Sequence, residues 1–188
     1  ITDDIREAIK EEKDEYIATC LNVKHSVKVI EDNTDMKLLE EKLPIKAITV
    51  MVQLEAADRI CAAVGSRECG AITASINYYA KPKKLFRVNR GSFMPAPNVD
   101  SAVISLERYE QPPYKVDNEP LFFEVIKQAF AQRRKQLANP VSAYFKIPKA
   151  VLAEKMTEGG IPATARAEQL TMAELVKLYE IIDELKKE

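Results

Sequence analysis

The sequence has a single histidine, His25, and this scarcity excludes several kinds of site. One histidine cannot form a histidine-based metal cluster, and it leaves no basis for a Ser/His/Asp catalytic set. We interpret His25 as a solvent-facing residue of a strand or loop. The sequence therefore predicts no metal site.

Cysteines and long apolar runs are also scarce. The three cysteines, Cys20, Cys61 and Cys69, are too far apart for a CxxC motif. A sparse, odd set is typical of reduced thiols in the cytoplasm. No apolar run approaches the ~20 residues of a membrane span, and no basic start followed by an apolar stretch suggests export. We expect a cytoplasmic protein that does not contact membranes.

Glycine is rare as well, and its positions exclude the common nucleotide-binding motifs. None of the five glycines belongs to a GxGxxG pattern or a P-loop. Such motifs need glycine because the backbone must approach the phosphates closely. No nucleotide cradle can therefore be read from the sequence. The glycines are residues 65, 70, 91, 159 and 160.

Charge is balanced overall but unevenly distributed. The net charge is −1, from 28 basic and 29 acidic residues. Acidic residues are frequent in the first 45 positions, whereas basic residues concentrate between 81 and 90 and at 133–135. Such a distribution is compatible with RNA binding, although many solvated faces have the same composition.

The first part of the chain has an α/β pattern. The nearly continuous β-branched run 45–52 predicts a strand buried on both faces, as in a parallel sheet covered by helices. We expect helices and strands around it at the following residues: helices 3–19, 36–42, 54–63 and 70–80, and strands 27–30, 85–88 and 102–106.

The composition changes at residues 109–114, where paired prolines with polar neighbours indicate a linker. Beyond it the pattern is helical, with helices expected at 119–135, 137–145 and 149–157. A capping box at Thr171 and Glu174 predicts the start of a last helix. The sequence therefore predicts two domains, residues 1–110 and 111–188.

The stretch 93–101, FMPAPNVDS, lies between two expected strands and organises the first domain. Each proline fixes its own φ and favours extended geometry in the residue before it, so the loop is stiff. Phe93 is thereby held in a defined place, either packed in the core or presented to stack on a planar ligand such as a base. Spacing alone leaves both readings open.

Two further places could carry chemistry. Glu55 follows the buried strand, where ligands bind in open α/β sheets, but it also suits the first turn of a helix. The run Arg133, Arg134 and Lys135 ends an expected helix, a favourable place for cations. Three consecutive cations point in different directions, so phosphate contact is an equally good reading.

Five separated segments resemble one known family. They are ITVMVQLEAADRI (48–60), NYYA (77–80), FMPAPNVDSAVI (93–104), AFAQRRKQLANP (129–140) and ARAEQLT (165–171). In this order and spacing they resemble the rRNA small-subunit adenine dimethyltransferases of the kasugamycin-resistance type, over roughly residues 36–188. The erythromycin-resistance methylases of large-subunit rRNA have a similar loop, but the helical tail is more similar to the former family.

The resemblance implies a class I, Rossmann-like methyltransferase domain, incomplete here, followed by a small helical rRNA-binding domain. It implies dimethylation of two adjacent adenines near the 3′ end of small-subunit rRNA within the 30S particle, with S-adenosylmethionine as donor. The target adenine would be taken out of its stack in the RNA, and Phe93 would stack on it. The protein would act as a monomer. The residues expected to shape the pocket or contact RNA are Pro95, Pro97, Val99, Arg133, Arg134 and Lys135.

The sequence departs from the family in its first part. The family's glycine-rich donor loop, its acidic ribose-binding residue and its Asn-Leu-Pro-Tyr motif have no counterparts, and residues 33–35, NTD, stand where that motif should end. No residue is therefore assigned to the donor. We interpret the chain as a family member without internal segments. The alternative function is a non-catalytic RNA-binding or ribosome-assembly module.

Overall fold

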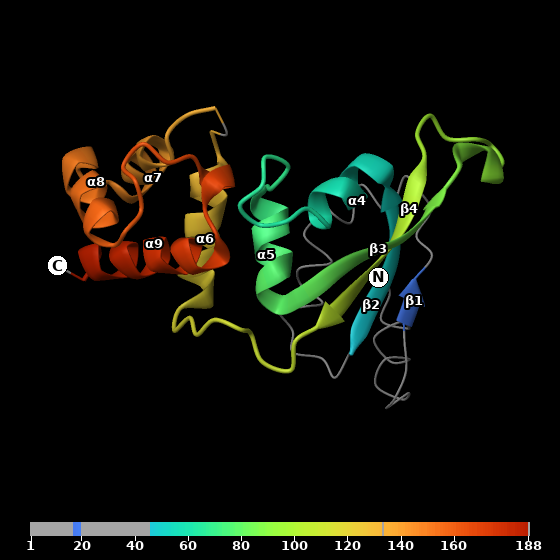
Figure 1. Ribbon diagram of the computed structural model, residues 1–188, viewed down its shortest axis with the longest axis horizontal. Coiled ribbons are helices and arrows are strands. Elements are labelled where there is room, and N and C mark those ends of the chain that lie inside the picture. Colours follow the sequence, from blue (N-terminus) through green and yellow to red (C-terminus); the bar gives the residue numbers. More distant parts are fainter. Residues whose placement is uncertain (1–16, 20–45, 133, 188) are drawn as a thin grey trace. The chain divides into compact units, whose positions relative to one another are not determined.

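The structure is a computed structural model that describes residues 17–19, 46–132 and 134–187. Its contacts divide the chain into two compact units. The first contains the described residues up to Cys61 together with Tyr79–Pro112, and the second contains Ala62–Tyr78 and Pro113 onward. Figure 1 shows the order of the elements along the chain. Residues 62–78, which the sequence assigns to the first domain, thus make their contacts within the helical unit.

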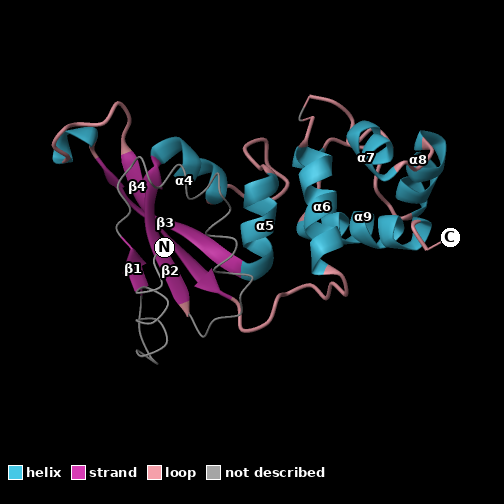
Figure 2. Ribbon diagram, turned by 180° about the vertical axis from the view of Figure 1, so that it is seen from behind, coloured by secondary structure: helices cyan, strands magenta, loops and turns pink. Residues whose placement is uncertain are grey.

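The described residues of the first unit form a four-stranded sheet. Its strand order is β1 (Ile17–Thr19), β2 (Ala47–Gln53), β4 (Ser101–Arg108) and β3 (Ala80–Val88). The pair β1–β2 is parallel, whereas β4 runs antiparallel to both β2 and β3 (Figure 2). Helix α4 (Leu54–Ile60) packs against β2, β3 and β4.

The core of this unit follows the two-residue alternation of the strands. The register places Val50 beside Ile104 and Val52 beside Ala102, and all four are buried. Ile60 is buried on the α4 side. These buried residues form part of the core of the first unit.

The predicted strand 45–52 is confirmed as β2, and the predicted strands around the Phe93 loop are confirmed as β3 and β4. Of the two neighbours of β2 in the described sheet, β1 is parallel and β4 is antiparallel to it, so the sheet is mixed. The predicted helix 3–19 is wrong at its end, where residues 17–19 form β1. Pairing with β2 there overrides the local helical pattern. The rest of that helix and the elements at 27–30 and 36–42 lie outside the described residues.

The second unit is helical. It contains residues 71–78 of α5 (Ala71–Tyr79), α6 (Glu119–Phe130), α7 (Ala138–Phe145), α8 (Lys149–Glu158) and α9 (Met172–Leu185). Its core includes an aromatic cluster, with ring centroids 5.1 Å apart for Tyr78 and Phe122 and 5.8 Å apart for Phe122 and Tyr179. All three residues are buried, so apolar burial stabilises this unit. No described helix is long and apolar enough to cross a membrane.

The helix ends agree with local capping signals, with one exception. The predicted capping box of α9 is confirmed, since the Thr171 backbone N–H donates to Glu174 Oε2 at 2.7 Å and the Glu174 N–H donates to Thr171 Oγ1 at 3.3 Å. Helix α6 ends at Phe130, so the prediction of a helix to Lys135 is wrong. Phe130 is the last buried residue of its apolar stripe, and the exposed residues after it have no packing to hold them in the helix.

Candidate functional site

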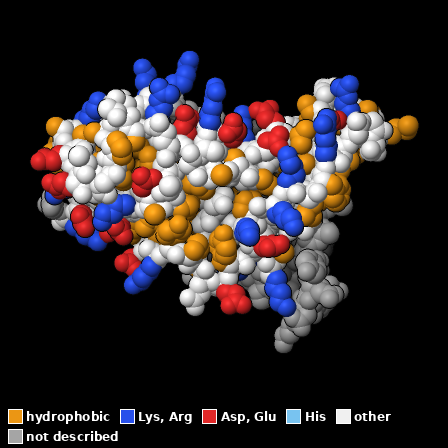
Figure 3. Space-filling model, in the orientation of Figure 1, with side chains coloured by type: hydrophobic (Ala, Val, Ile, Leu, Met, Phe, Trp, Pro, Cys, Tyr) orange, Lys and Arg blue, Asp and Glu red, His pale blue; other side chains and the backbone are white. Residues whose placement is uncertain are grey.

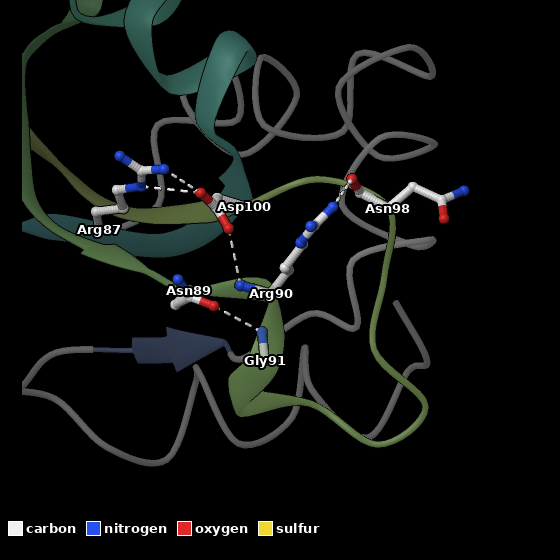
Figure 4. Close-up of polar contacts among 6 residues, drawn as sticks. All are labelled: Arg87, Asn89, Arg90, Gly91, Asn98 and Asp100. Carbon is white, nitrogen blue, oxygen red and sulfur yellow. Dashed lines mark hydrogen bonds and ion pairs between the residues drawn. The ribbon is translucent and has the colours of Figure 1, made fainter.

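The connection between β3 and β4, residues 89–100, forms one side of the candidate site (Figure 4). It begins with a short 3-10 turn, η1 (Arg90–Ser92), capped by Asn89. The side-chain oxygen of Asn89 accepts a 2.8 Å hydrogen bond from the Gly91 N–H. A Cβ at position 91 would lie 3.2 Å from that oxygen, so glycine suits this close approach. The cap fixes the direction in which the chain leaves β3.

Asp100 closes the other end of the loop. Its Oδ2 accepts hydrogen bonds from the Arg87 guanidinium, at 3.0 Å for Nε, and its Oδ1 accepts one from the Arg90 N–H at 2.9 Å. Arg90 also donates through its side chain to the Asn98 carbonyl at 3.3 Å (Figure 4). These bonds, with that from Arg87 first, hold the pKa of Asp100 below its usual value. We call Arg87, Arg90 and Asp100 the clasp.

The clasp is joined by a backbone hydrogen bond to the start of α4, directly after β2. The Leu54 N–H, at the start of α4, donates to the Asp100 carbonyl at 2.9 Å. Between α4 and the loop lies an open cleft of about 590 Å³. Its polar lining offers carboxylates, amides and one guanidinium. The cleft residues are Gln53, Leu54, Glu55, Asp58, Asn89, Arg90, Asn98, Val99 and Asp100.

The predicted loop residues have different positions relative to this cleft. Val99 is 43% exposed and lines it, whereas Phe93, Pro95 and Pro97 are not among the lining residues. Phe93 is half-buried, so the reading that places it in the core is wrong. The neighbouring Met94 is fully exposed. The roles of Phe93 and the two prolines toward an adenine stay predictions.

Glu55 combines the two roles that the sequence leaves open. It lies in the first turn of α4 and also lines the cleft. Its carboxylate accepts a 2.7 Å hydrogen bond from Arg59, one helical turn later. An exposed pair of this kind contributes little to stability, so it does not prevent Glu55 from contacting a ligand.

The clasp and the amides beside it are not among the residues predicted from the sequence. In the sequence, Arg87 and Arg90 stand out only as members of a basic stretch, and Asp100 only as part of the loop motif. A signal was available, because a basic residue near the end of one hairpin strand and an acidic residue at the start of the next are brought together by antiparallel pairing. The Asn89–Gly91 spacing is likewise typical of a side-chain cap.

The basic run belongs to the second unit. Arg134 and Lys135 are exposed in the turn that follows α6, and neither forms an ion pair with another described residue. The Lys135 N–H donates to the Gln132 carbonyl at 2.9 Å, which shapes the turn. Arg133 lies outside the described residues. The RNA-binding role of the three residues stays a prediction.

Comparison with known proteins decides the family. A sequence model described as ribosomal RNA adenine dimethylase matches residues 19–184. The chain belongs to the ribosomal RNA adenine dimethylase family. It is 46% identical over 154 residues to "Ribosomal RNA small subunit methyltransferase A" of Lachnoclostridium phytofermentans, covering 81% of this chain and 53% of the relative. It is 41% identical over 140 residues to the protein of that name from Alkaliphilus oremlandii, covering 74% and 49%.

Solved structures agree with this membership at the level of fold. A dimethyladenosine transferase from Plasmodium falciparum superposes with a TM-score of 0.63 at 23% identity, over 84% of this chain and 62% of that one. The 23S rRNA methyltransferase ErmE superposes with a TM-score of 0.60 at 19% identity, over 89% and 65%. The predicted fold class is therefore confirmed, an incomplete Rossmann-like methyltransferase sheet with helices. This member of the ribosomal RNA adenine dimethylase family spans about half the length of the curated relatives it matches.

Proposed function

We propose that this chain belongs to an rRNA small-subunit methyltransferase that dimethylates two adjacent adenines near the 3′ end of small-subunit rRNA. Its partner is the rRNA of the 30S particle, its methyl donor is S-adenosylmethionine, and it acts as a monomer in the cytoplasm. The observation that carries the proposal is the clasped loop, which carries the family's aromatic–proline motif beside a polar cleft at the end of β2.

The cleft suits an adenine chemically. Its volume of about 590 Å³ lies within the range of small-molecule sites. The exocyclic amine of adenine donates hydrogen bonds, and carboxylate and amide oxygens of the lining, such as those of Glu55 and Asn98, can accept them. Arg90 can donate to a ring nitrogen. Phe93, three residues beyond Arg90 in the same loop, would supply a stacking face.

Pro95, Pro97 and Val99 would shape the pocket around that base. A rigid loop loses little conformational entropy when it orders around a ligand, and prolines supply such rigidity. Val99 already lines the cleft. The amine of an adenine held in this way would react because it is well oriented, and no strong catalytic base would be needed.

The described residues do not fit the donor. A donor cradle in this kind of fold needs a glycine-rich turn between a strand and a helix, but β2 passes directly from Gln53 to Leu54. Of the five glycines, none lies at that junction. We therefore assign no donor contact to the described residues and derive no step through the donor.

We also propose that residues 111–188 form the rRNA-binding domain, with Arg133, Arg134 and Lys135 on the phosphates. The exposure of Arg134 and Lys135 and their lack of described ion pairs support this role, because unpaired cations can displace counterions from RNA.

Methyl transfer from labelled donor to under-methylated 30S particles, catalysed by the complete protein to which this chain belongs, tests the proposal. Phe93→Ala should lower kcat/KM by roughly 5- to 150-fold, the effect of losing one base–aromatic stack. Met94→Ala is the matched control, since Met94 is adjacent and fully exposed. Equal activity of the two variants would remove Phe93 from the site.

A calorimetric titration of the complete protein with S-adenosylmethionine separates catalysis from the alternative of a non-catalytic binding module. Donor binding together with methyl incorporation supports the enzyme. Binding to 30S particles with neither donor binding nor incorporation contradicts it.

A further inference from the structure

Strand β3 lies at the edge of the described sheet, and one of its two faces carries an unusual combination of side chains. Within the described part of the chain it pairs with β4 alone. The register places Lys83 beside Ser105 and Phe86 beside Val103. Since Ser105 and Val103 are two positions apart on β4, Lys83 and Phe86 lie on the same face of the sheet. Lys81, two positions before Lys83, shares that face. We call Lys81, Lys83 and Phe86 the β3 face.

Protection against edge-to-edge pairing explains only part of this strand. Pro82 cannot donate to a neighbouring strand, and the register shift between Lys84 and Phe86 interrupts the ladder. Lysines on an edge have the same effect. These features argue against an added protein strand as the occupant. They do not explain Phe86 and Leu85, which are 58% and 45% exposed.

The charges on the two faces of β3 are used differently. Lys84 pairs with Asp58 at 2.5 Å, and Arg87 pairs with Asp100, so the cations beside α4 are neutralised. Lys81 and Lys83 form no ion pair with any residue in the described ranges. Figure 3 shows Lys and Arg side chains along this part of the sheet, interspersed with hydrophobic ones.

We propose that the β3 face binds a single-stranded segment of RNA, with Lys81 and Lys83 on phosphates and a base stacked on Phe86. Unpaired cations beside an exposed aromatic match the two needs of such a ligand, a negative backbone and an unstacked base. The spacing fits as well, because residues two apart on a strand are about 6.5–7 Å apart and can contact successive positions of an extended chain. The proposal takes RNA as partner from the proposed function. It does not depend on methyl transfer or on the cleft.

Binding of a labelled single-stranded RNA of about 12 nucleotides, measured over a range of salt concentrations, tests the surface. Lys81→Gln with Lys83→Gln should lower the slope of log K against log salt by about 1.4, at ~0.7 for each phosphate contact on a single strand. Lys81→Arg with Lys83→Arg should keep the slope. An unchanged slope in the glutamine variant would overturn the proposal.

The aromatic part is tested with size-matched changes. Phe86→Leu keeps an apolar side chain without a π-face and should weaken binding roughly tenfold, whereas Phe86→Tyr should bind as the parent does. Leu85→Ala is the control for the neighbouring exposed apolar residue. If Phe86→Leu and Phe86→Tyr bind the RNA equally well, and heparin competes for the surface as well as unlabelled RNA does, the β3 face is only a basic surface. That result would overturn the proposed stacking of a base on Phe86.

The two proposals fail separately. RNA binding in these experiments contains no donor and is scored without methylation. If particles receive no methyl groups but the β3 variants change the salt slope as expected, the proposed function fails and the β3 face stands. If methylation depends on Phe93 but the β3 variants have no effect, the reverse holds.

Discussion

Arg87 and Asp100 join the end of β3 to the start of β4, and two guanidinium nitrogens donate to the same carboxylate oxygen. The Asp100 side chain is only 15% exposed, although that of Arg87 is largely in solvent. The other carboxylate oxygen of Asp100 accepts a hydrogen bond from the Arg90 N–H. The backbone carbonyl of Asp100 accepts one from the Leu54 N–H at the start of α4. Hydrogen bonds to charged groups are stronger than neutral ones. One residue thus fixes both ends of the loop that carries Phe93.

Asp100→Asn should loosen this loop, because an amide lacks the charge and the full accepting capacity that both arginines use. The chain contains no tryptophan, so Phe93→Trp provides a single fluorescent probe within the loop. In the Phe93→Trp background, Asp100→Asn should lower the fluorescence anisotropy while the far-ultraviolet circular dichroism stays unchanged. Asp58→Asn is the control, since its partner Lys84 lies within β3. Equal anisotropy in all three proteins would show that the clasp does not order the loop.

The same clasp should respond to acid. The pKa of Asp100 is lower in the folded protein than its usual value of 3.8, so its contribution is complete above that value and is lost as the pH falls through the lower, folded-state pKa. Tryptophan anisotropy should therefore be constant from neutral pH down to about 4 and decrease below it. Asp100→Asn should remove this step. A step near neutral pH, or one that survives in Asp100→Asn, would assign the response to another group.

Sequence patterns predict the elements whose burial has one clear period. The run 45–52 becomes β2 because its β-branched residues pack between two strands, and the Thr171–Glu174 spacing becomes a capping box because it satisfies backbone donors locally. The local pattern predicts a helix at residues 17–19, because their pairing with residues 48–50 is not visible in local sequence. The pattern also predicts too late an end for α6, because the cations at 133–135 suit a helix terminus even where no packing supports one.

The sequence predicts where the site lies in the chain better than it predicts how the residues of the site are arranged. Two prolines and an aromatic between strands identify a rigid loop, but they do not determine whether Phe93 is buried, and in the structure it is half-buried. The clasp depends on the register that brings Arg87 opposite the start of β4. Register is a tertiary property, set by which faces are buried. Only the family resemblance connected the loop with the helical tail.

The exposed turn after α6 should contribute to RNA affinity through charge alone. Arg134→Glu with Lys135→Glu should weaken binding to small-subunit rRNA and lower the salt slope by about 1.4 to 1.8, at ~0.7 to 0.9 for each lost phosphate contact. The exchange Arg134→Lys with Lys135→Arg keeps the charge and should keep the slope. Thermal unfolding should be the same in all variants, since both side chains are exposed. Unchanged RNA affinity in the double glutamate variant would remove the turn from the binding surface.

Tyr78 should make the second unit sensitive to alkali. Burial raises its pKa to about 12, and the charge of Glu119 and a hydrogen bond to that carboxylate act in the same direction. A raised pKa in an acid means that the folded state favours the neutral hydroxyl. The associated stability is therefore complete below the ordinary tyrosine pKa of about 10 and is lost as the pH rises toward 12.

Urea unfolding at a series of pH values between 8 and 12 measures this loss, with Tyr78→Phe as the matched variant. The phenylalanine variant keeps the ring that packs on Phe122 but has no proton to lose. Lysines and other tyrosines titrate in both proteins, so the difference between their unfolding free energies isolates Tyr78. That difference should be constant up to pH 10. Above pH 10 the unfolding free energy of the parent protein should fall relative to that of Tyr78→Phe. If it stays constant to pH 12, the Tyr78 hydroxyl does not gain its high pKa from the folded core, and the aromatic cluster is more accessible to water than its burial indicates.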